Sequence, residues 1–388
     1  HYILGDNITI PASKFAPIGF VNSDPAPFKG SLSGRLQTFT ESGSSSISNY
    51  NLSITVTGTS RTSTDNYGKL YGLFTILEGS ISNLNIHIGF LEKTESNNGF
   101  STVGKSIAGG IAAINRGRIE NVYAYLSGVV ELNGVTDFGG IVGINETKDA
   151  LIGTIKNCVV DSSNRLTINA KVASNIGGVV GKNESVISGK YAGKDSLNNI
   201  VYDTVVNMTV NNLVADITYN IGAVAGVSST DISNLLVGGQ IYINSKAADD
   251  SQLPLHGYLA GIVGDTTANI TTVAAVGLDL INEGKNGIKV AGIAGGVNTI
   301  EDAKFVSVLA KFGSIETVGE LVGKIVAGIA FTGNVEYSSV ESFIKTRNGG
   351  TFFTLDGETA YGLINTGNVS NSFVSANIKA SETPYLTS

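Results

Sequence analysis

The sequence predicts an all-β protein: a parallel, right-handed β-helix, or solenoid, of about ten coils of roughly 36 residues each. Three observations predict it. A glycine-rich box returns throughout the chain, a box centred on asparagine follows it, and the composition suits short strands joined by tight turns. Among 388 residues there are 49 glycines, 6 prolines and no tryptophan, and 42% of residues are hydrophobic against 15% charged. Disordered chains favour charge and proline, so this composition predicts a folded array.

The glycine box is typified by FGGIVG at 138 and IGGVVG at 176. A phosphate-binding loop occurs once or twice in a chain, whereas this box returns nine times at spacings of 30 to 45 residues, as a structural repeat does. Glycine allows a coil to bend or to pass close to its neighbour, because it has no Cβ atom. We therefore expect the third residues of the boxes to stack in one column: Gly72, Gly110, Gly140, Gly178, Ala223, Gly261, Gly292, Gly328 and Gly362.

The second box reads aliphatic, polar, Asn, any residue, any residue, apolar, as in ISNLNI at 81 and ISNLLV at 232. Asparagine tolerates the left-handed backbone, so a bend at its third position brings both apolar positions to one face. The third position is Asn in seven of ten copies, and Thr272, Asp302 and Tyr337 are the exceptions. We expect these asparagines to form a second column, in which amides can bond along the stack: Asn49, Asn83, Asn121, Asn157, Asn199, Asn234 and Asn371.

A third strand follows in most repeats, for example RLTINA at 165, NMTVNN at 207 and QIYINS at 240. Each repeat then holds three short strands and three turns, and we expect one coil, or two, per repeat. Residues 1–40 are irregular and proline-rich, which predicts an N-terminal cap, and residues 41–388 form the repeat array as a single domain. Since open β-helix ends expose unpaired backbone, we expect the chain to continue in a larger parent protein.

The two boxes together resemble the GLUG motif of bacterial surface and secreted proteins. FAPIGF at 15, PFKGSLSG at 27 and SISNYNLSI at 46 resemble that family's opening of a repeat array. The resemblance implies an adhesin-like, extracellular, non-catalytic region. Some family members are immunoglobulin-A-cleaving metalloproteases, but this sequence contains no His-Glu-x-x-His zinc motif, so protease activity is not carried over.

The net charge, the hydrophobic runs and the cysteine content exclude several classes of partner and of cross-link. The net charge of −7 argues against nucleic acid, which is bound through clustered lysine and arginine. No apolar run approaches the ~20 residues that cross a bilayer. The one cysteine, Cys158, excludes an internal disulfide framework. It occupies an aliphatic position of its box, so we expect it to be buried and inert.

Few residues have the chemistry of a catalytic or metal site. His1 is terminal, His87 should point outward from a strand, and His256 is expected in a loop. A metal site needs several clustered ligands, which the sequence does not show, although a Ser-His-Asp triad assembled in space stays an alternative. Asp249-Asp250 is interpreted as a solvated loop, with a calcium or catalytic role as the alternative. We predict no catalytic residue, metal or cofactor.

Two hypotheses of function remain. The first is a non-enzymatic adhesin or stalk segment that binds a glycan or protein on a host or neighbouring bacterial cell. The alternative is a carbohydrate-active β-helix enzyme, a polysaccharide lyase or hydrolase. Extra residues at 146–154 and 182–196 are expected to form a shared protrusion at one corner. There Lys190, Tyr191 and Lys194 are the candidate contacts for an anionic glycan or an acidic protein patch.

Overall fold

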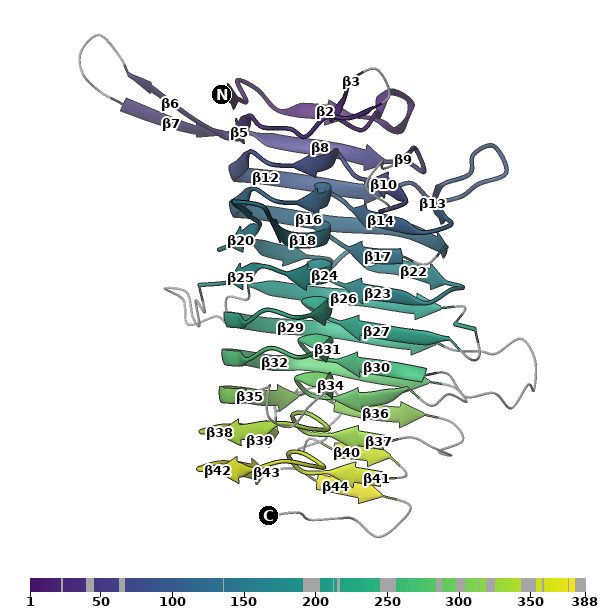
Figure 1. Ribbon diagram of the computed structural model, residues 1–388, viewed down its shortest axis with the longest axis vertical. Helices are drawn as coiled ribbons and strands as arrows, with labels where there is room; N and C mark the ends of the chain where they lie inside the picture. The colour runs from purple at the N-terminus through teal and green to yellow at the C-terminus, as the bar shows by residue number, and fades with distance from the viewer. Residues whose placement is uncertain are drawn as a thin grey trace.

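The computed structural model is all-β (Figure 1). It describes residues 1–21, 24–39, 45–62, 67–134, 136–190, 203–211, 213–214, 217–244, 256–283, 288–297, 304–312, 314–318, 325–342, 354–357, 359–375 and 377–380. Within these ranges the helical structure amounts to one 3-10 turn, η1 (Ala12–Lys14), and no α-helix is present. No helix in the described ranges is long and apolar enough to cross a membrane.

Three sheets, all parallel in their main stacks, account for most strands. The largest has 22 strands and is here called the long sheet. Its members are β1 (Tyr2–Ile3), β2 (Ile8–Ile10), β5 (Ser31–Ser33), β8 (Asn51–Val56), β12 (Ser80–Phe90), β13 (Phe100–Val103), β16 (Arg118–Asn133), β20 (Thr154–Lys156), β21 (Val159–Asp161), β22 (Leu166–Ala170), β25 (Val186–Ser188), β26 (Thr204–Asn211), β29 (Ile232–Asn244), β32 (Ile270–Glu283), β35 (Lys304–Phe312), β36 (Ser314–Val318), β38 (Asn334–Glu336), β39 (Ser339–Ser342), β40 (Thr354–Gly357), β42 (Val369–Ser370), β43 (Phe373–Ser375) and β44 (Asn377–Ala380).

Two shorter stacks lie on either side of the glycine boxes. The ten-stranded sheet consists of β9 (Arg61–Thr62), β10 (Lys69–Tyr71), β14 (Ser106–Gly109), β17 (Thr136–Gly139), β23 (Ser174–Gly177), β27 (Thr218–Gly222), β30 (His256–Ala260), β33 (Lys289–Ala291), β37 (Ile325–Ala327) and β41 (Thr359–Tyr361). The eight-stranded sheet consists of β11 (Phe74–Leu77), β15 (Ala112–Asn115), β18 (Val142–Lys148), β19 (Leu151–Ile152), β24 (Val180–Glu184), β28 (Ala225–Ser228), β31 (Val263–Thr266) and β34 (Ala294–Val297). Two antiparallel hairpins are separate: β3 (Phe20–Val21) with β4 (Asp24–Pro25), and β6 (Arg35–Phe39) with β7 (Ser45–Asn49).

The pairing register follows the sequence repeat. Phe138 pairs with Ala108 on one side and with Ile176 on the other, at the spacing of the glycine boxes. Most repeats supply one layer to each of the three sheets, whereas the described parts of the last two repeats meet the eight-stranded stack only in isolated bridges such as Ala294 to Ala330. One repeat thus corresponds to one layer rather than two. This arrangement of stacked parallel sheets (Figure 1) is compatible with a parallel β-helix.

The glycine box is explained by close approach between layers. A Cβ atom on Gly140 would lie 2.3 Å from the carbonyl oxygen of Gly178, the anchor of the next layer, and 2.2 Å from Leu126 Cδ1. The same relation joins Gly110 to Gly140, Gly178 to Ala223, Gly261 to Gly292 and Gly328 to Gly362. The predicted glycine column is therefore confirmed at these positions, and the motif is a packing device rather than a phosphate loop.

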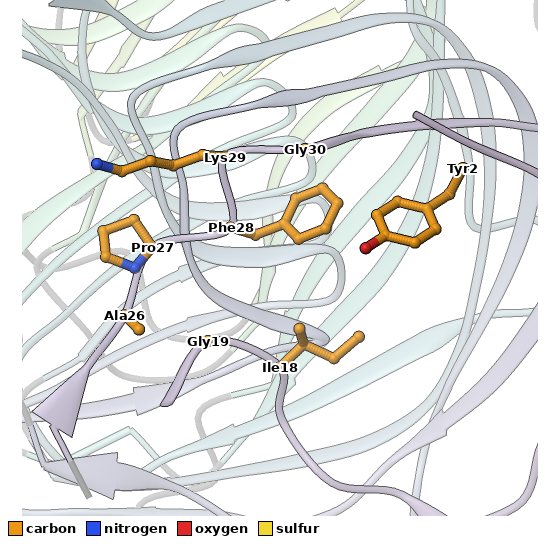
Figure 2. A pocket seen from close by; sticks show the side chains of 8 residues that line it. All are labelled: Tyr2, Ile18, Gly19, Ala26, Pro27, Phe28, Lys29 and Gly30. Carbon is orange, nitrogen blue, oxygen red and sulfur yellow. The ribbon is translucent and has the colours of Figure 1, made fainter. Parts of the chain in front are cut away.

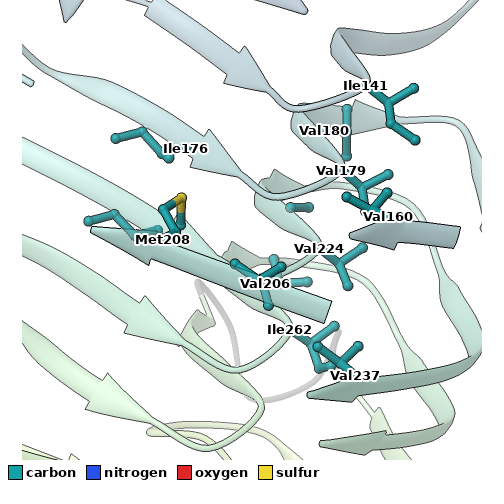
Figure 3. Close-up of a cluster of buried hydrophobic side chains, with 14 of the residues drawn as sticks. Ile141, Val160, Ile176, Val179, Val180, Val206, Met208, Val224, Val237 and Ile262 are labelled. Carbon is teal, nitrogen blue, oxygen red and sulfur yellow. The ribbon is translucent and has the colours of Figure 1, made fainter. Parts of the chain in front are cut away.

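The interior is filled by small and medium aliphatic side chains. In the middle of the stack, Val179, Val180 and Val224 belong to the same buried cluster as Val206 and Met208 (Figure 3). Most of these side chains are 0–2% exposed. A smaller apolar cluster lies between the ten- and eight-stranded sheets, formed by Leu70, Ile76, Ile107, Ala113, Ile114 and Ile144.

The predicted bend in the long sheet is present. The third residue of the second box has a left-handed φ of 49–57° in five copies, at Asn83, Asn121, Asn157, Asn234 and Asn371. Thr272, at the same position of its box, has φ 53°. Tyr337 has φ 47°, so the bend does not require asparagine. We call these positions the bend column. Cys158, which directly follows Asn157, is buried as predicted.

Three residues that were assigned from the sequence to the asparagine box do not occupy the bend column: Asp302, Asn49 and Asn199. Asp302 lies outside the described residues, and the bend of its repeat is at Ser307, with φ 54°, because Phe305 pairs with Ile270 and Val335. Asn49 does not occupy the column but ends the outward hairpin strand β7. Asn199 lies outside the described residues, and the column position of its layer is filled by Gly189, because Ile187 pairs with Ile155 and Ile232, the first residues of the neighbouring boxes. A short aliphatic-polar-polar pattern can be aligned with the neighbouring repeats in several registers, and only the strand pairing decides which register forms.

The third strand also forms as predicted. Leu166, Met208, Ile241 and Leu280 are successive partners in the long sheet. At the N-terminal end, in the predicted cap, Tyr2 pairs with Leu32 and Ile8 with Leu52. The first 40 residues thus add strands to the edge of the long sheet.

Candidate functional site

A polar hollow lies on the outer face of the long sheet. It is a groove of about 320 Å³ lined by Arg35, Asn49, Asn83, Asn85 and Asn121, which we call the amide groove. All five residues are exposed. They come from three successive layers, since Asn85 pairs with Asn51 in the layer before and with Tyr123 in the layer after.

A hairpin builds one wall of this groove. The long-sheet strand of the first layer stops at Ser33, which pairs with Ser82, and resumes at Asn51, which pairs with Asn85. Between them the chain leaves the sheet as β6–β7, the arm at the upper left of Figure 1. Arg35 and Asn49 face each other at its base, closed by the hydrogen bond of 2.7 Å from Tyr50 N to Gly34 O. Asn83 Cα forms the bend of the next layer, and its carbonyl oxygen lies 3.0 Å from the Cβ position of Gly34.

An aromatic row of His87, Tyr123 and Tyr125 borders the groove on the same face. The rings of His87 and Tyr125 stack at 4.5 Å between centroids, and those of Tyr123 and Tyr125 also lie 4.5 Å apart. The Tyr123 hydroxyl donates to Asp161 Oδ2 at 3.3 Å. Burial, with the nearby negative charge of Asp161, raises the pKa of Tyr123. Its phenol therefore stays protonated and is poorly suited to act as a base.

A second polar feature lies at the junction of the eight-stranded and long sheets. Arg116 Nε donates to Glu146 Oε1 at 2.6 Å, and Arg116 Nη1 lies 3.6 Å from Glu78 Oε1. These three side chains, here called the ion ladder, are 6–13% exposed. Tyr67 covers them and donates to both oxygens of Glu146. Burial is the largest single influence and lowers the pKa of Arg116, but the hydrogen bonds and charge interactions with Glu146 and Tyr67 together outweigh it, so the net shift of this pKa is upward. Since its groups are paired with one another, this ladder holds layers together.

A buried amide ladder is formed by Asn115, Asn145 and Asn183, the first two of which directly precede Arg116 and Glu146 of the ion ladder. Asn115 Nδ2 donates to Asn145 Oδ1 at 2.8 Å, and Asn145 Nδ2 donates to Asn183 Oδ1 at 2.9 Å. All three residues are fully buried. This ladder was not predicted, because the sequence led us to expect hydrogen-bonded amides along the second-box asparagines instead. In the bend column the one such bond among the described residues joins Asn157 to Asn121, at 3.5 Å.

The contact residues predicted from the insertions are only partly described. Lys190 is exposed, and its backbone N–H donates to Asp203 Oδ1 at 3.0 Å, whereas Tyr191 and Lys194 lie outside the described residues. The expected shared corner was wrong. Residues 147–152 form an antiparallel hairpin beside the eight-stranded sheet, but Val186–Ser188 is a regular strand of the long sheet.

The remaining candidates are dispersed. His87 is exposed, as expected, and His256 opens β30 rather than lying in a loop. His1 contacts the Ser31 hydroxyl, and Asp249-Asp250 lies outside the described residues. Burial raises the pKa of the Cys158 thiol to about 12. Within the described ranges no three His, Cys, Asp or Glu side chains are placed to hold a metal ion.

A more apolar hollow of about 350 Å³ lies at the N-terminal edge (Figure 2). Tyr2, Ile18 and Phe28 contribute its larger side chains, and the Tyr2 and Phe28 rings lie 6.1 Å apart. It carries a single lysine, Lys29, which lies 3.6 Å from Glu78. It therefore offers fewer hydrogen-bonding groups than the amide groove.

Comparison of the chain with protein-family models, with curated proteins and with solved structures finds no match. The amide groove was not predicted from the sequence, although three of its residues, Asn49, Asn83 and Asn121, were assigned to the asparagine column. The available signal was Asn85, an amide two residues beyond the bend, where Tyr123 and Val159 occupy the same position in the next layers.

Proposed function

We propose that this chain is a non-enzymatic, extracellular segment of a larger bacterial surface protein, an adhesin or its stalk. In this proposal a right-handed parallel β-helix of about ten coils presents a ligand-binding face. The resemblance of the glycine and asparagine boxes to the GLUG motif supports the proposal. So does the close stacking of box anchors in the runs Gly110 to Ala223, Gly261 to Gly292 and Gly328 to Gly362.

One observation carries the binding role: the outer face of the long sheet presents exposed amides and aromatic rings together. Burial hides the apolar side chains inside the stack, and the ion ladder is satisfied internally. The amide groove, by contrast, keeps hydrogen-bonding groups directed to solvent. A face of this kind is suited to a polar cell-surface ligand, because each amide offers two donors and an acceptor oxygen.

A carbohydrate-active enzyme is the alternative, because Tyr123 and Asp161 form a hydrogen-bonded pair beside the groove. The raised pKa of Tyr123 disfavours it as a base at neutral pH. We therefore propose binding without turnover.

The test uses the whole chain, fluorescently labelled, with bacterial and host epithelial cells and with a panel of polysaccharides. We expect saturable binding to cells and no increase in reducing ends. Release of reducing ends that scales with protein concentration would support the enzyme instead. If the protein binds none of the cell types saturably, the adhesin hypothesis is contradicted.

A further inference from the structure

The composition of the amide groove indicates which class of ligand it suits. Four of the five lining residues are asparagines and the fifth is arginine. Among the described residues, the side-chain amides of Asn83 and Asn85 make no hydrogen bond within the protein. Asn121 Oδ1 accepts one long hydrogen bond, of 3.5 Å, from Asn157. The groove therefore presents several donors and acceptors within one small hollow.

Backbone requirements explain only part of this set. Asn83 and Asn121 have left-handed φ values of 52° and 54°, for which asparagine is favoured among residues with a side chain. Asn85 has no such φ, and Arg35 and Asn49 belong to the hairpin base. Three of the five lining residues are thus not required by the bend.

The neighbouring aromatic row adds a different kind of contact. Tyr123 is the direct partner of Asn85 in the next layer, and His87, two residues beyond Asn85, pairs with Tyr125. The rings stack on one another along the sheet, so their edges and polar atoms are the parts that can meet a ligand. Amides beside a border of ring edges and polar ring atoms match a sugar, whose hydroxyls both donate and accept hydrogen bonds.

Arg35 is the one charged residue among the five that line the groove. A guanidinium pairs with a carboxylate through two parallel hydrogen bonds, which a neutral sugar cannot offer. The nearby cation Arg118 is already paired with Glu120 at 2.8 Å. The local charge of the groove thus favours an acidic sugar although the whole chain is acidic.

We propose that the amide groove binds a carboxylate-bearing oligosaccharide, of the uronic or sialic acid class. The Asn83, Asn85 and Asn121 amides bond its hydroxyls, and Arg35 pairs with its carboxylate. This inference rests on the proposed function, because it names the ligand class of the same binding face.

The experiment measures binding to the full chain by ligand-observed NMR and calorimetry. The probes are sialyllactose and a galacturonate trisaccharide, with lactose and maltotriose as their neutral counterparts. We expect the unaltered protein to bind at least one acidic probe more tightly than its neutral counterpart. Arg35→Ala should lower affinity for that acidic probe by about tenfold or more, as expected for losing a hydrogen bond to a charged group, and should erase the preference over the neutral sugar.

Matched controls separate binding from folding. Asn83→Ala and Asn371→Ala remove the same left-handed bend residue, but Asn371 lies at the far end of the bend column. Arg35→Ala is likewise matched by Arg118→Ala, another exposed arginine. We expect Asn83→Ala and Asn85→Ala to reduce sugar affinity about tenfold or more, and Asn371→Ala and Arg118→Ala to leave it unchanged, with thermal unfolding monitored for each variant.

Three results would overturn the inference: no acidic probe binds, neutral sugars bind equally well, or Asn371→Ala weakens binding as much as Asn83→Ala does. Cell binding distinguishes this failure from failure of the proposed function. If Arg35→Ala and Asn85→Ala adhere to cells as well as the unaltered protein, the groove is not the site and adhesion stands. If the unaltered protein binds no cell, adhesion itself fails.

Discussion

Asn145 donates a 2.9 Å hydrogen bond from its side-chain amide to Oδ1 of Asn183, one layer further along the stack. Both side chains are fully buried, and the same amide group of Asn145 also lies 3.3 Å from the Val186 carbonyl oxygen. Asn145 therefore joins two layers through the interior. The ladder satisfies polar groups that would be costly to bury without partners.

Replacing Asn145 with Asp should destabilise the protein by about 2–4 kcal/mol at neutral pH, because an ionised carboxylate cannot donate to Asn183 and is buried without a cation. Burial should raise the pKa of the new carboxyl above its value in the unfolded chain. Stability should thus be recovered as the pH falls and lost as the pH rises through the folded-state pKa. Urea unfolding from pH 4 to pH 8 measures this. Asn121→Asp, at an exposed bend, is the control and should change little.

Gly140→Ala should cost about 1–3 kcal/mol, because the new methyl group would lie 2.3 Å from the Gly178 oxygen and 2.2 Å from Leu126 Cδ1. Gly5→Ala is the matched control, since nothing lies within 4 Å of the Cβ position of Gly5. Thermal denaturation compares the two. Equal melting temperatures would contradict the packing role of the glycine column.

Removing Arg116 should be far more costly than removing Arg118. Arg116→Met leaves the carboxylate of Glu146 largely buried without its cation, which typically costs about 3–5 kcal/mol, whereas Glu78 keeps Lys29 at 3.6 Å. Arg118 is 65% exposed in its pair with Glu120, so Arg118→Met should change stability by less than about 1 kcal/mol. Chemical denaturation measures both, and a double-mutant cycle with Glu146→Gln isolates the pair. Similar losses for both variants would show that the ion ladder is not buried.

The Cys158 thiol should react with iodoacetamide far more slowly in the folded than in the unfolded protein, because it is 7% exposed and burial raises its pKa to about 12. The folded pKa exceeds the unfolded one. The thiol's contribution to stability is therefore complete below the unfolded pKa of about 8.5 and is lost as the pH rises toward 12. Cys158→Val has no thiol to ionise, so it should lose less stability than the unaltered protein as the pH rises. Equal labelling rates would place the thiol at the surface.

Much of the fold was predictable because the repeat amplifies weak signals. A single glycine box has several explanations, but nine copies exclude a phosphate loop and predict stacked layers. The left-handed bends at Asn83, Asn121 and Asn157 followed from apolar positions that had to share one face. The bend at Ser307 was missed because serine gives little backbone signal, and because two overlapping patterns fit the same stretch until Phe305 pairs with Ile270.

The groove was less predictable than the fold. Arg35 and Asn49 are separated from Asn83 and Asn121 by tens of residues, and they meet because a hairpin replaces the bend of the first layer. The sequence of residues 31–56 gives both strand fragments but not the point at which the chain leaves the sheet. The buried amide ladder was hidden for a similar reason, since Asn145 lies two residues beyond the glycine box FGGIVG and its hydrogen-bond partners belong to the neighbouring layers.

The sequence by itself determined the repeat, the all-β class, the inward aliphatic positions and the burial of Cys158, because periodic burial leaves a periodic pattern in the chain. Only the tertiary structure decided the register between layers. It also decided which asparagines face inward, as Asn145 does, and which face outward, as Asn83 does. The physical reason is that stacking brings together residues a full repeat apart. Their hydrogen bonds depend on layer-to-layer alignment, which no local pattern specifies.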